Sequence, residues 1–160
     1  MLTHLPALIV VVPLLVGLSI PLVRHARAAW GMATLTVLAV FGMAIQLLLQ
    51  VNELVRVSQD PAAFISYAMG NWQIPWGIEY RVDPLNAFVV LIIAMIAAVV
   101  TVYARLSIEH EIPKDRIHFF YSLWLLFITG LLGVTMTGDV FNVYVLLEIS
   151  ALTSYVLIAM

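Results

Sequence analysis

The chain has 160 residues, with seven Lys and Arg against nine Asp and Glu, and 64% of its residues are hydrophobic. Only 10% are charged and the mean hydropathy is +1.09, whereas soluble chains are about half apolar and a quarter charged. Lipid must therefore be the solvent for most of the chain. This composition excludes a disordered chain and, at a net charge of −2, a basic nucleic-acid binder. The absence of cysteine excludes disulfides, iron–sulfur ligation and thiol catalysis.

Five apolar stretches are each long enough to cross about 30 Å of hydrocarbon, at a rise of about 1.5 Å per residue. They predict an all-α integral membrane protein with transmembrane helices at 5–23, 30–52, 84–105, 118–137 and 140–160. The first stretch contains three prolines, which membrane helices tolerate better than soluble helices do.

The long connection between the second and third stretches is predicted to be ordered. Ile78, Tyr80 and Val82 alternate with charged residues, which is the period of a β-strand. The same connection contains Trp72 and Trp76, and tryptophans favour the headgroup level of a membrane. The pattern is equally compatible with a small outer hairpin and with an interfacial aromatic anchor, and both can hold together.

Two aspartates stand directly before predicted helices. Asp83 precedes Pro84, and Asp139 follows Gly138. Aspartate is favoured at a helix N-cap and proline in the first turn, while glycine commonly ends the preceding helix. We therefore expect both aspartates to be capping residues, although Asp139 at the outer mouth could also gather cations as an entry site.

The charges in the connections predict the orientation, because Lys and Arg favour the cytoplasmic side. The first and third connections carry Arg24, His25, Arg27, Arg105, Lys114 and Arg116. The second connection has two arginines but four acids. We therefore expect a multi-pass protein of the plasma membrane with its amino terminus and second connection outside.

The third connection, placed at 106–117, also contains His110 between Glu109 and Glu111. Such a cluster could suggest a metal site, but the spacing of the ligands is poor and the segment is expected to face solvent. A solvated loop of mixed charge is the favoured interpretation, and no metal or cofactor is expected in this chain.

One charge lies far from any helix end. Glu148 follows Asp139 by nine residues, which places it about 13 Å into the fifth helix and near the middle of the bilayer. An ionised carboxylate there costs at least about 2.5 kcal/mol. Such residues usually face a protein interior or a water-filled cavity and mark an ion or proton path. Glu148 is therefore the leading candidate for function.

The helical wheel gives Glu148 polar neighbours. Tyr144 and Tyr155 fall within about 60° of it, whereas Ser150 and Ser154 lie on the opposite face at a spacing that permits close helix packing. Glu148, Tyr144 and Tyr155 are predicted to form a proton path. The alternative is a protonated glutamate that makes one interhelical hydrogen bond and only stabilises packing.

Three segments carry a resemblance to a known family. They are Thr137–Ser150 (TGDVFNVYVLLEIS) with 154–159 (SYVLIA), Trp72–Ile78 (WQIPWGI) and Asp83–Asn86 (DPLN). The chain resembles the antiporter-like membrane subunits, which include the proton-pumping subunits of respiratory complex I and of membrane-bound hydrogenases. The family also includes subunits of Mrp multisubunit cation/proton antiporters, and the sequence is most similar to the Mrp D-type subunit.

The resemblance implies a role for Glu148, which matches the fifth-helix glutamate of the family. That glutamate is paired with a lysine on the seventh helix, and the pair is thought to switch the protonation of a central relay. Family members are about three times longer than this chain, so the seventh-helix lysine and the later relay residues are missing from it. The stop at Met160 predicts a fragment, a split subunit or a truncated product.

The resemblance also implies a domain organisation. Residues 1–117 would supply three peripheral helices with the outer connection at 53–83. Residues 118–160 would supply the first two helices of the first transport repeat. The chain would be the amino-terminal part of an antiporter-like helical bundle.

The function expected on this basis is a membrane subunit of a multisubunit cation/proton antiporter that takes part in proton translocation, with sodium left open. The alternatives are a proton-pumping subunit of a complex I-like NADH:quinone oxidoreductase or hydrogenase, and a non-transporting scaffold. The chain shows no nucleotide, flavin or cluster motif, so any redox chemistry would belong to partner subunits. The expected partners are other membrane subunits, the lipid bilayer and protons, without nucleic acid.

Overall fold

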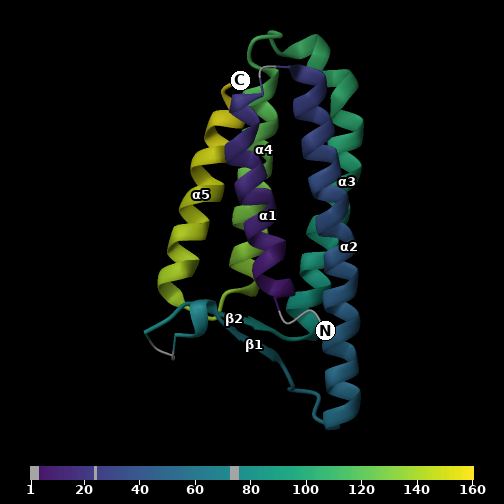
Figure 1. The fold of residues 1–160 in the computed structure, drawn as a ribbon, viewed down its shortest axis with the longest axis vertical. Helices are drawn as coiled ribbons and strands as arrows, with labels where there is room; N and C mark the ends of the chain where they lie inside the picture. The colour runs from purple at the N-terminus through teal and green to yellow at the C-terminus, as the bar shows by residue number, and fades with distance from the viewer. Residues whose placement is uncertain (1–3, 24, 73–75) are drawn as a thin grey trace.

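Five long helices run side by side along most of the molecule in the computed structural model, which describes residues 4–23, 25–72 and 76–160 (Figure 1). Their bounds are α1 Leu5–Ser19, continued by the 3₁₀ turn η1 Ile20–Leu22, then α2 Ala26–Ser58, α3 Pro84–Glu111, α4 Ile117–Met136 and α5 Val140–Ile158. Each of the five is long and apolar enough to cross a membrane. The predicted fold class and the five spans are therefore confirmed.

The second helix is longer than the apolar run that predicted it. α2 has 33 residues, or about 50 Å at 1.5 Å per residue, against about 30 Å of hydrocarbon. Its last two turns mix polar with apolar residues and include an exposed Glu53–Arg56 ion pair at 3.7 Å. Gln59 ends the helix in the left-handed conformation, with φ 55. The apolar run at 30–52 marked only the part of this helix that lipid can cover.

The third connection is shorter than predicted, because α3 continues through Glu109 and His110 to Glu111. Arg105 and Glu109 form an ion pair one turn apart, at 3.7 Å, and this pairing supports the added turns. The prediction of a loop starting at residue 106 is therefore wrong for the first six residues. Within the described residues, no group of three or more His, Asp or Glu is placed to hold a metal ion.

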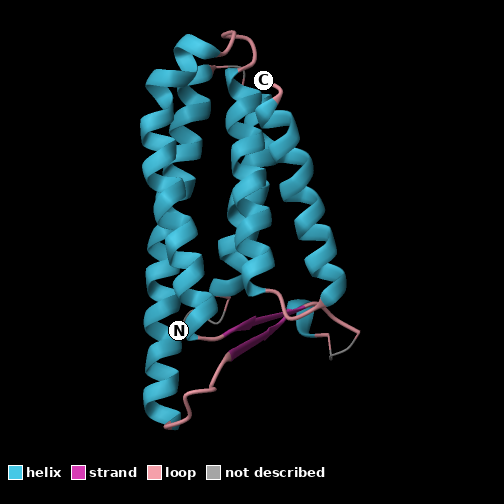
Figure 2. Ribbon diagram, turned by 180° about the vertical axis from the view of Figure 1, so that it is seen from behind, coloured by secondary structure: helices cyan, strands magenta, loops and turns pink. Residues whose placement is uncertain are grey.

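The connection between α2 and α3 forms the expected hairpin. Strand β1 (Ile65–Ala68) pairs antiparallel with β2 (Glu79–Val82), with Tyr67 opposite Tyr80 (Figure 2). A 3₁₀ turn, η2 (Met69–Asn71), follows β1. The apolar residues Tyr80 and Val82 of β2 are buried while the charged Arg81 between them is exposed, as the alternation predicted.

The aromatic motif beside the hairpin is only partly described. Trp72 and Trp76 are 68% and 88% exposed, so both side chains are available to an interface, and the anchor role stays a prediction. The part of the motif at 73–75 lies outside the described residues, as does Arg24 in the first connection.

The hairpin is held against the turn between α4 and α5. Tyr80 forms an isolated antiparallel bridge with Thr137, and the Gly138 amide donates to the Glu79 carbonyl at 2.9 Å. Asp83 caps α3 as predicted, because its carboxylate accepts from the Asn86 amide at 2.7 Å. The Asn86 side chain in turn donates to the Thr135 carbonyl at 2.8 Å. The hairpin therefore fixes the ends of three helices.

Polar contacts also join the helices inside the bundle. Trp124 of α4 donates to the Thr101 hydroxyl at 2.8 Å, and Trp30 of α2 donates to the Thr101 carbonyl at 3.2 Å. Ser122 donates to the Gly17 carbonyl at 2.6 Å, which ties α4 to α1. Lipid offers buried polar groups no hydrogen bonds, so each of these must be satisfied within the protein.

Candidate functional site

The candidate site is built on α5, which begins at a capped turn. The two carboxylate oxygens of Asp139 accept from the amides of Phe141 and Asn142, at 3.3 and 3.2 Å. These bonds satisfy two of the four amides that every helix start leaves without a partner. The capping role predicted for Asp139 is therefore confirmed, while its role as a cation entry stays a prediction.

One face of α5 packs on α4. The buried residues of α5 recur every three or four positions: Asn142, Leu146, Ser150 and Thr153. They meet two glycines of α4, because an added Cβ at Gly130 would stand 2.7 Å from the Ser150 Cβ, and one at Gly133 would stand 2.7 Å from the Leu146 side chain. The close approach expected at Ser150 is therefore present, and it turns the opposite face of α5 outward.

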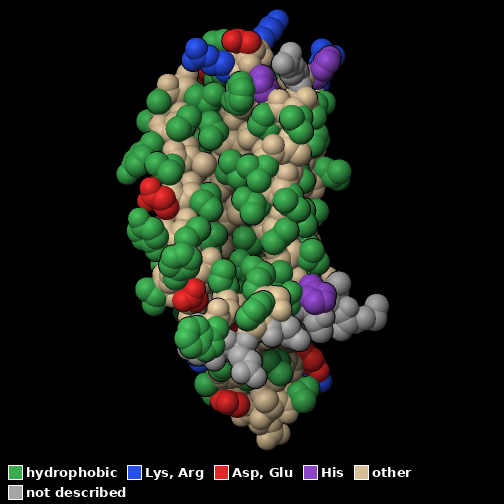
Figure 3. Space-filling model, turned by 60° about the vertical axis from the view of Figure 1, so that its left-hand side comes forward, with side chains coloured by type: hydrophobic (Ala, Val, Ile, Leu, Met, Phe, Trp, Pro, Cys, Tyr) green, Lys and Arg blue, Asp and Glu red, His purple; other side chains and the backbone are tan. Residues whose placement is uncertain are grey.

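The predicted proton-path residues share that outward face. Glu148 is exposed, with eight residues of α5 before it and ten after it. Tyr144 and Tyr155 are 68% and 67% exposed, and the apolar Phe141 and Leu152 beside them are also exposed. Figure 3, which brings the α5 side forward, shows acidic side chains among hydrophobic ones on this face.

No partner for Glu148 occurs in the described part of the chain. The two ion pairs found there involve other residues, and no hydrogen bond joins Glu148 to Tyr144 or Tyr155. Within the described residues, α4 is the only element with which α5 makes extensive contact. The structure thus brings the three predicted residues onto one helix face but does not bring them into contact with each other.

One polar residue of this helix was missed by the sequence reasoning. Asn142 is buried near the start of α5, and its amide donates to the Thr137 hydroxyl at 2.9 Å. Burial raises the pKa of the Tyr80 phenol above its usual 10.0, and a hydrogen bond with Asn142 partly offsets this rise. Asn142 therefore links α5 to the hairpin, and a lone amide in an apolar run was the signal that could have revealed it.

The sequence has relatives among membrane subunits of respiratory and antiporter complexes. It is 39% identical over 167 residues to NADH-quinone oxidoreductase subunit N of Desulforudis audaxviator, a match that covers 99% of this chain and 30% of that subunit. It is 31% identical over 122 residues to the D-type subunit of a Na(+)/H(+) antiporter from Alkalihalophilus pseudofirmus, covering 76% of this chain and 23% of that protein. No protein-family model matches the chain.

Solved structures agree with these relatives on the fold. The chain matches an archaeal membrane-bound sulfane sulfur reductase with a TM-score of 0.76 and 23% identity, over 94% of this chain and 29% of that one. It matches the Mrp complex of a Dietzia species with a TM-score of 0.78 and 20% identity, over 96% of this chain and 26% of that one.

The chain belongs to the antiporter-like membrane subunits, as the resemblance in its sequence predicted. It spans less than a third of the length of the relatives and structures named above. The family includes both the N-type respiratory subunit and the D-type antiporter subunit, and the chain is similar to each.

Proposed function

We propose that this chain takes part in proton translocation within a multisubunit membrane complex, with Glu148 as the carboxyl that takes up and releases the proton. The observation that carries the proposal is the position of this carboxyl. It lies at the middle of an apolar helix, on a face that the described residues of the chain leave uncovered.

The energetic argument is that lipid cannot be the neighbour of this face. A charged carboxylate at the bilayer centre costs at least about 2.5 kcal/mol, and burial of even a neutral polar group without a partner is unfavourable. Further helices or a water-filled cavity must therefore adjoin Glu148 in the working complex. A carboxyl placed between desolvation and a nearby cation can exchange a proton at moderate cost.

The tyrosines on the same face extend the polar track. Tyr144 lies about 6 Å before Glu148 along the helix axis, and Tyr155 lies about 10 Å after it. Both hydroxyls can donate and accept hydrogen bonds, so each can continue a chain of waters toward one end of the helix. Asp139 would stand at the outer end of this track, although its two carboxylate oxygens already accept from the α5 amides.

The packing of the helices supports a division of the chain into a scaffold part and a transport part. We assign α1, α2, α3 and the hairpin to a peripheral scaffold, and α4 and α5 to the first two helices of the transport repeat. Contact between α4 and α5 is the most extensive of any two elements in the described residues, and the carboxyl is borne by that pair. The exposed face of α5 is then the surface that the remaining helices of the complex cover.

The distribution of charge between the two ends of the bundle supports the proposed orientation. The amino-terminal end of the described chain lies at the hairpin end of the molecule, and the α1–α2 and α3–α4 connections lie at the other (Figure 1). Arg27 lies in the first turn of α2 beside one of these connections, and the other carries Lys114 and Arg116. We therefore propose a protein of the plasma membrane with the hairpin and the amino terminus outside.

A second candidate activity is exchange of Na⁺ or K⁺ for protons, which the relatives named as Na(+)/H(+) and K(+)/H(+) antiporter subunits favour. The relative named as NADH-quinone oxidoreductase subunit N favours respiratory proton pumping instead. Both activities need a proton-exchanging carboxyl, and they differ in the cation required. Measuring proton movement in vesicles with and without Na⁺ or K⁺ distinguishes them.

The test is Glu148→Gln in the assembled complex, which keeps the side-chain shape but removes the titrating proton. We expect proton movement in vesicles to fall strongly while subunit abundance stays near wild type. Glu148→Asp should be intermediate, because it keeps the acid and shortens its reach by about 1.5 Å. Glu53→Gln, in the exposed end of α2, is the matched control and should transport normally. Wild-type transport by the Glu148→Gln complex would show that the carboxyl only stabilises packing.

A further inference from the structure

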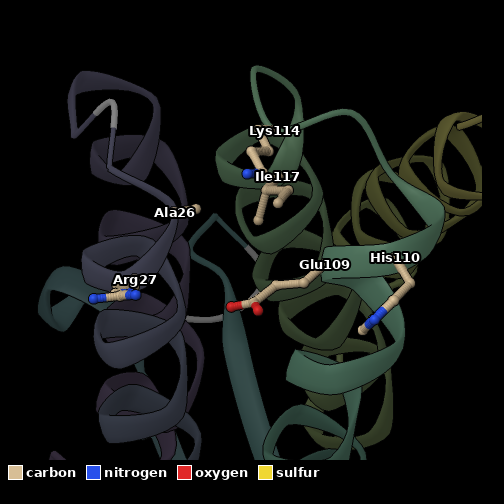
Figure 4. Close-up of a pocket in the computed structure, with 6 residues that line it drawn as sticks. All are labelled: Ala26, Arg27, Glu109, His110, Lys114 and Ile117. Carbon is tan, nitrogen blue, oxygen red and sulfur yellow. The ribbon is translucent and has the colours of Figure 1, made fainter.

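A cavity of about 390 Å³ opens at the end of the bundle opposite the hairpin. Its lining comes from the start of α2, the end of α3, the short loop after it and the first residue of α4: Ala26, Arg27, Glu109, His110, Lys114 and Ile117. Figure 4 shows the Glu109 carboxylate reaching from α3 toward α2, where Arg27 lies, while Lys114 sits above Ile117. Residues about eighty positions apart thus meet around one space of a size typical of ligand sites.

The residues that line this cavity carry a net positive charge, from Arg27 and Lys114 against Glu109. Its single acid, Glu109, is already paired with Arg105 at 3.7 Å. Arg27 and Lys114 form no ion pair with any carboxylate of the described residues. His110 uses Nδ1 in a 2.7 Å contact with the Leu106 carbonyl, which leaves Nε2 free for another partner. The cavity therefore has two uncompensated cations and no uncompensated acid.

A neighbouring tryptophan indicates the level in the membrane at which the cavity lies. Trp30 lies one turn into α2 from Arg27, about 4.5 Å along the axis, and its ring stacks under the Arg105 guanidinium at 4.4 Å. Tryptophan rings and snorkelling arginines are typical of the headgroup level of a membrane. The cations of the cavity are thus at the depth where lipid phosphates lie.

An apolar strip continues from the polar lining toward the bilayer. Leu106 lies one turn below Glu109 and His110 on α3, and Val102 and Tyr103 lie one turn below Leu106. All three of these lower side chains are exposed, at 70%, 52% and 70%. A ligand that binds here meets cations at its head and an apolar helix face along its tail.

We propose that this cavity binds the phosphate of an anionic phospholipid, with Arg27 and Lys114 as the phosphate ligands and the exposed strip of α3 along the acyl chains. Basic pockets between transmembrane helices hold lipid headgroups in this way. A soluble phosphate would use the cations but would gain nothing from the strip. A zwitterionic lipid would use the strip but would bring a positive group to a site that is already positive.

Binding is tested on the 160-residue chain in neutral maltoside micelles. The probes are dioctanoyl phosphatidylglycerol, dioctanoyl phosphatidylcholine and inorganic phosphate, each titrated at low and high salt. We expect phosphatidylglycerol to bind with at least about tenfold higher affinity than either other probe. Because the contact is ionic, its affinity should fall as the salt concentration rises.

Substitutions identify the site. Each cation near a lipid surface contributes about 1 kcal/mol, so removing both in Arg27→Gln/Lys114→Gln should weaken phosphatidylglycerol binding about 30-fold, at 1.4 kcal/mol per tenfold. Arg56→Gln removes an exposed cation from the far end of α2 and should leave binding unchanged. Glu109→Gln removes the only acid of the lining and should tighten binding severalfold.

The proposal is overturned if inorganic phosphate or phosphatidylcholine binds as tightly as phosphatidylglycerol, or if the double variant retains wild-type affinity. If the double variant does not fold, Glu109→Gln decides on its own, because it keeps both cations. Tighter phosphatidylglycerol binding by that variant supports the site, and unchanged binding refutes it. None of these outcomes depends on proton transport, so they leave the role of Glu148 to its own test.

Discussion

Replacing Gly130 by alanine should push α5 away from α4. In the native packing, a Cβ at this position would stand 2.7 Å from the Ser150 Cβ, 2.8 Å from the Leu146 carbonyl oxygen and 2.9 Å from the Ser150 amide nitrogen. Non-bonded heavy atoms are most stable about 3.5–4.0 Å apart. Two of the three contacts are with backbone, so no side-chain rotation relieves them, and α5 must retreat by about 1 Å.

The magnitude combines two opposing effects. Overpacking of a close contact costs about 1–3 kcal/mol, and a backbone contact that cannot rotate away belongs near the upper value. Alanine also improves helix propensity by about 1 kcal/mol over glycine. We therefore expect Gly130→Ala to lose about 2 kcal/mol of unfolding free energy. Gly42→Ala, where an added Cβ meets nothing within 4 Å, should gain up to about 1 kcal/mol.

The assay is reversible unfolding of both variants in mixed micelles, together with the distance between spin labels on the exposed faces of α4 and α5. The expected difference of about 3 kcal/mol between the two variants is well above the usual error of such measurements. If Gly130→Ala is as stable as Gly42→Ala and the label distance is unchanged, the two helices do not cross at Gly130, and the outward orientation of Glu148 loses its structural basis.

Three further predictions concern the hairpin end of the bundle and the orientation in the membrane. Asp83→Ala should lose about 1 kcal/mol of unfolding free energy, because the Asn86 amide loses its cap, whereas Asp83→Asn should lose much less. Burial raises the pKa of Tyr80, so its contribution to stability should be complete below pH 10 and lost as the pH rises through the raised pKa. The decline of unfolding free energy above pH 10 should therefore be steeper in wild type than in Tyr80→Phe, and equal slopes would contradict the burial argument. A cysteine at position 60 should react with a membrane-impermeant reagent from outside and one at position 112 only from inside, and the reverse pattern would refute the orientation.

The helices and their caps could be predicted from the sequence because each depends on residues that are close together in the chain. A run of about twenty apolar residues has no other stable placement than a membrane span. Aspartate before a helix is read from adjacent positions, and the structure places Asp83 and Asp139 as predicted. The strand Glu79–Val82 was visible because one of its faces is buried and the other is exposed.

Features that depend on contacts between residues distant in the chain could not be predicted from the sequence. The first strand, Ile65–Ala68, pairs with the second through backbone groups and has no alternation strong enough to predict it. The polar end of α2 continues as helix beyond the apolar limit that defined the prediction. The cavity joins the start of α2, at Arg27, to the segment 106–117, whose charges by themselves predicted only a solvated loop.

The exposure of Glu148 shows a further limit of helical wheels. The wheel correctly placed Tyr144 and Tyr155 on the face of Glu148, opposite Ser150, because the helical repeat fixes relative directions. It could not show which neighbour each face meets, because hydrophobicity no longer separates inside from outside when lipid is the solvent. The face of α5 that turns inward is the one that packs closely on Gly130 and Gly133 of α4.

The hairpin contact with the α4–α5 turn sets an order of events during synthesis. The strand that carries Tyr80 leaves the ribosome before α3, α4 and the turn at Thr137, yet it needs that turn to complete its bridge. Until α4 has inserted, the Glu79 carbonyl lacks the Gly138 amide from which it accepts a hydrogen bond in the folded chain. The hairpin end can close only after α4 has inserted, so formation of this bridge reports the insertion of α4. A chain whose fourth helix fails to insert would display an open strand edge, a feature by which quality-control proteases could distinguish it from a correctly inserted chain.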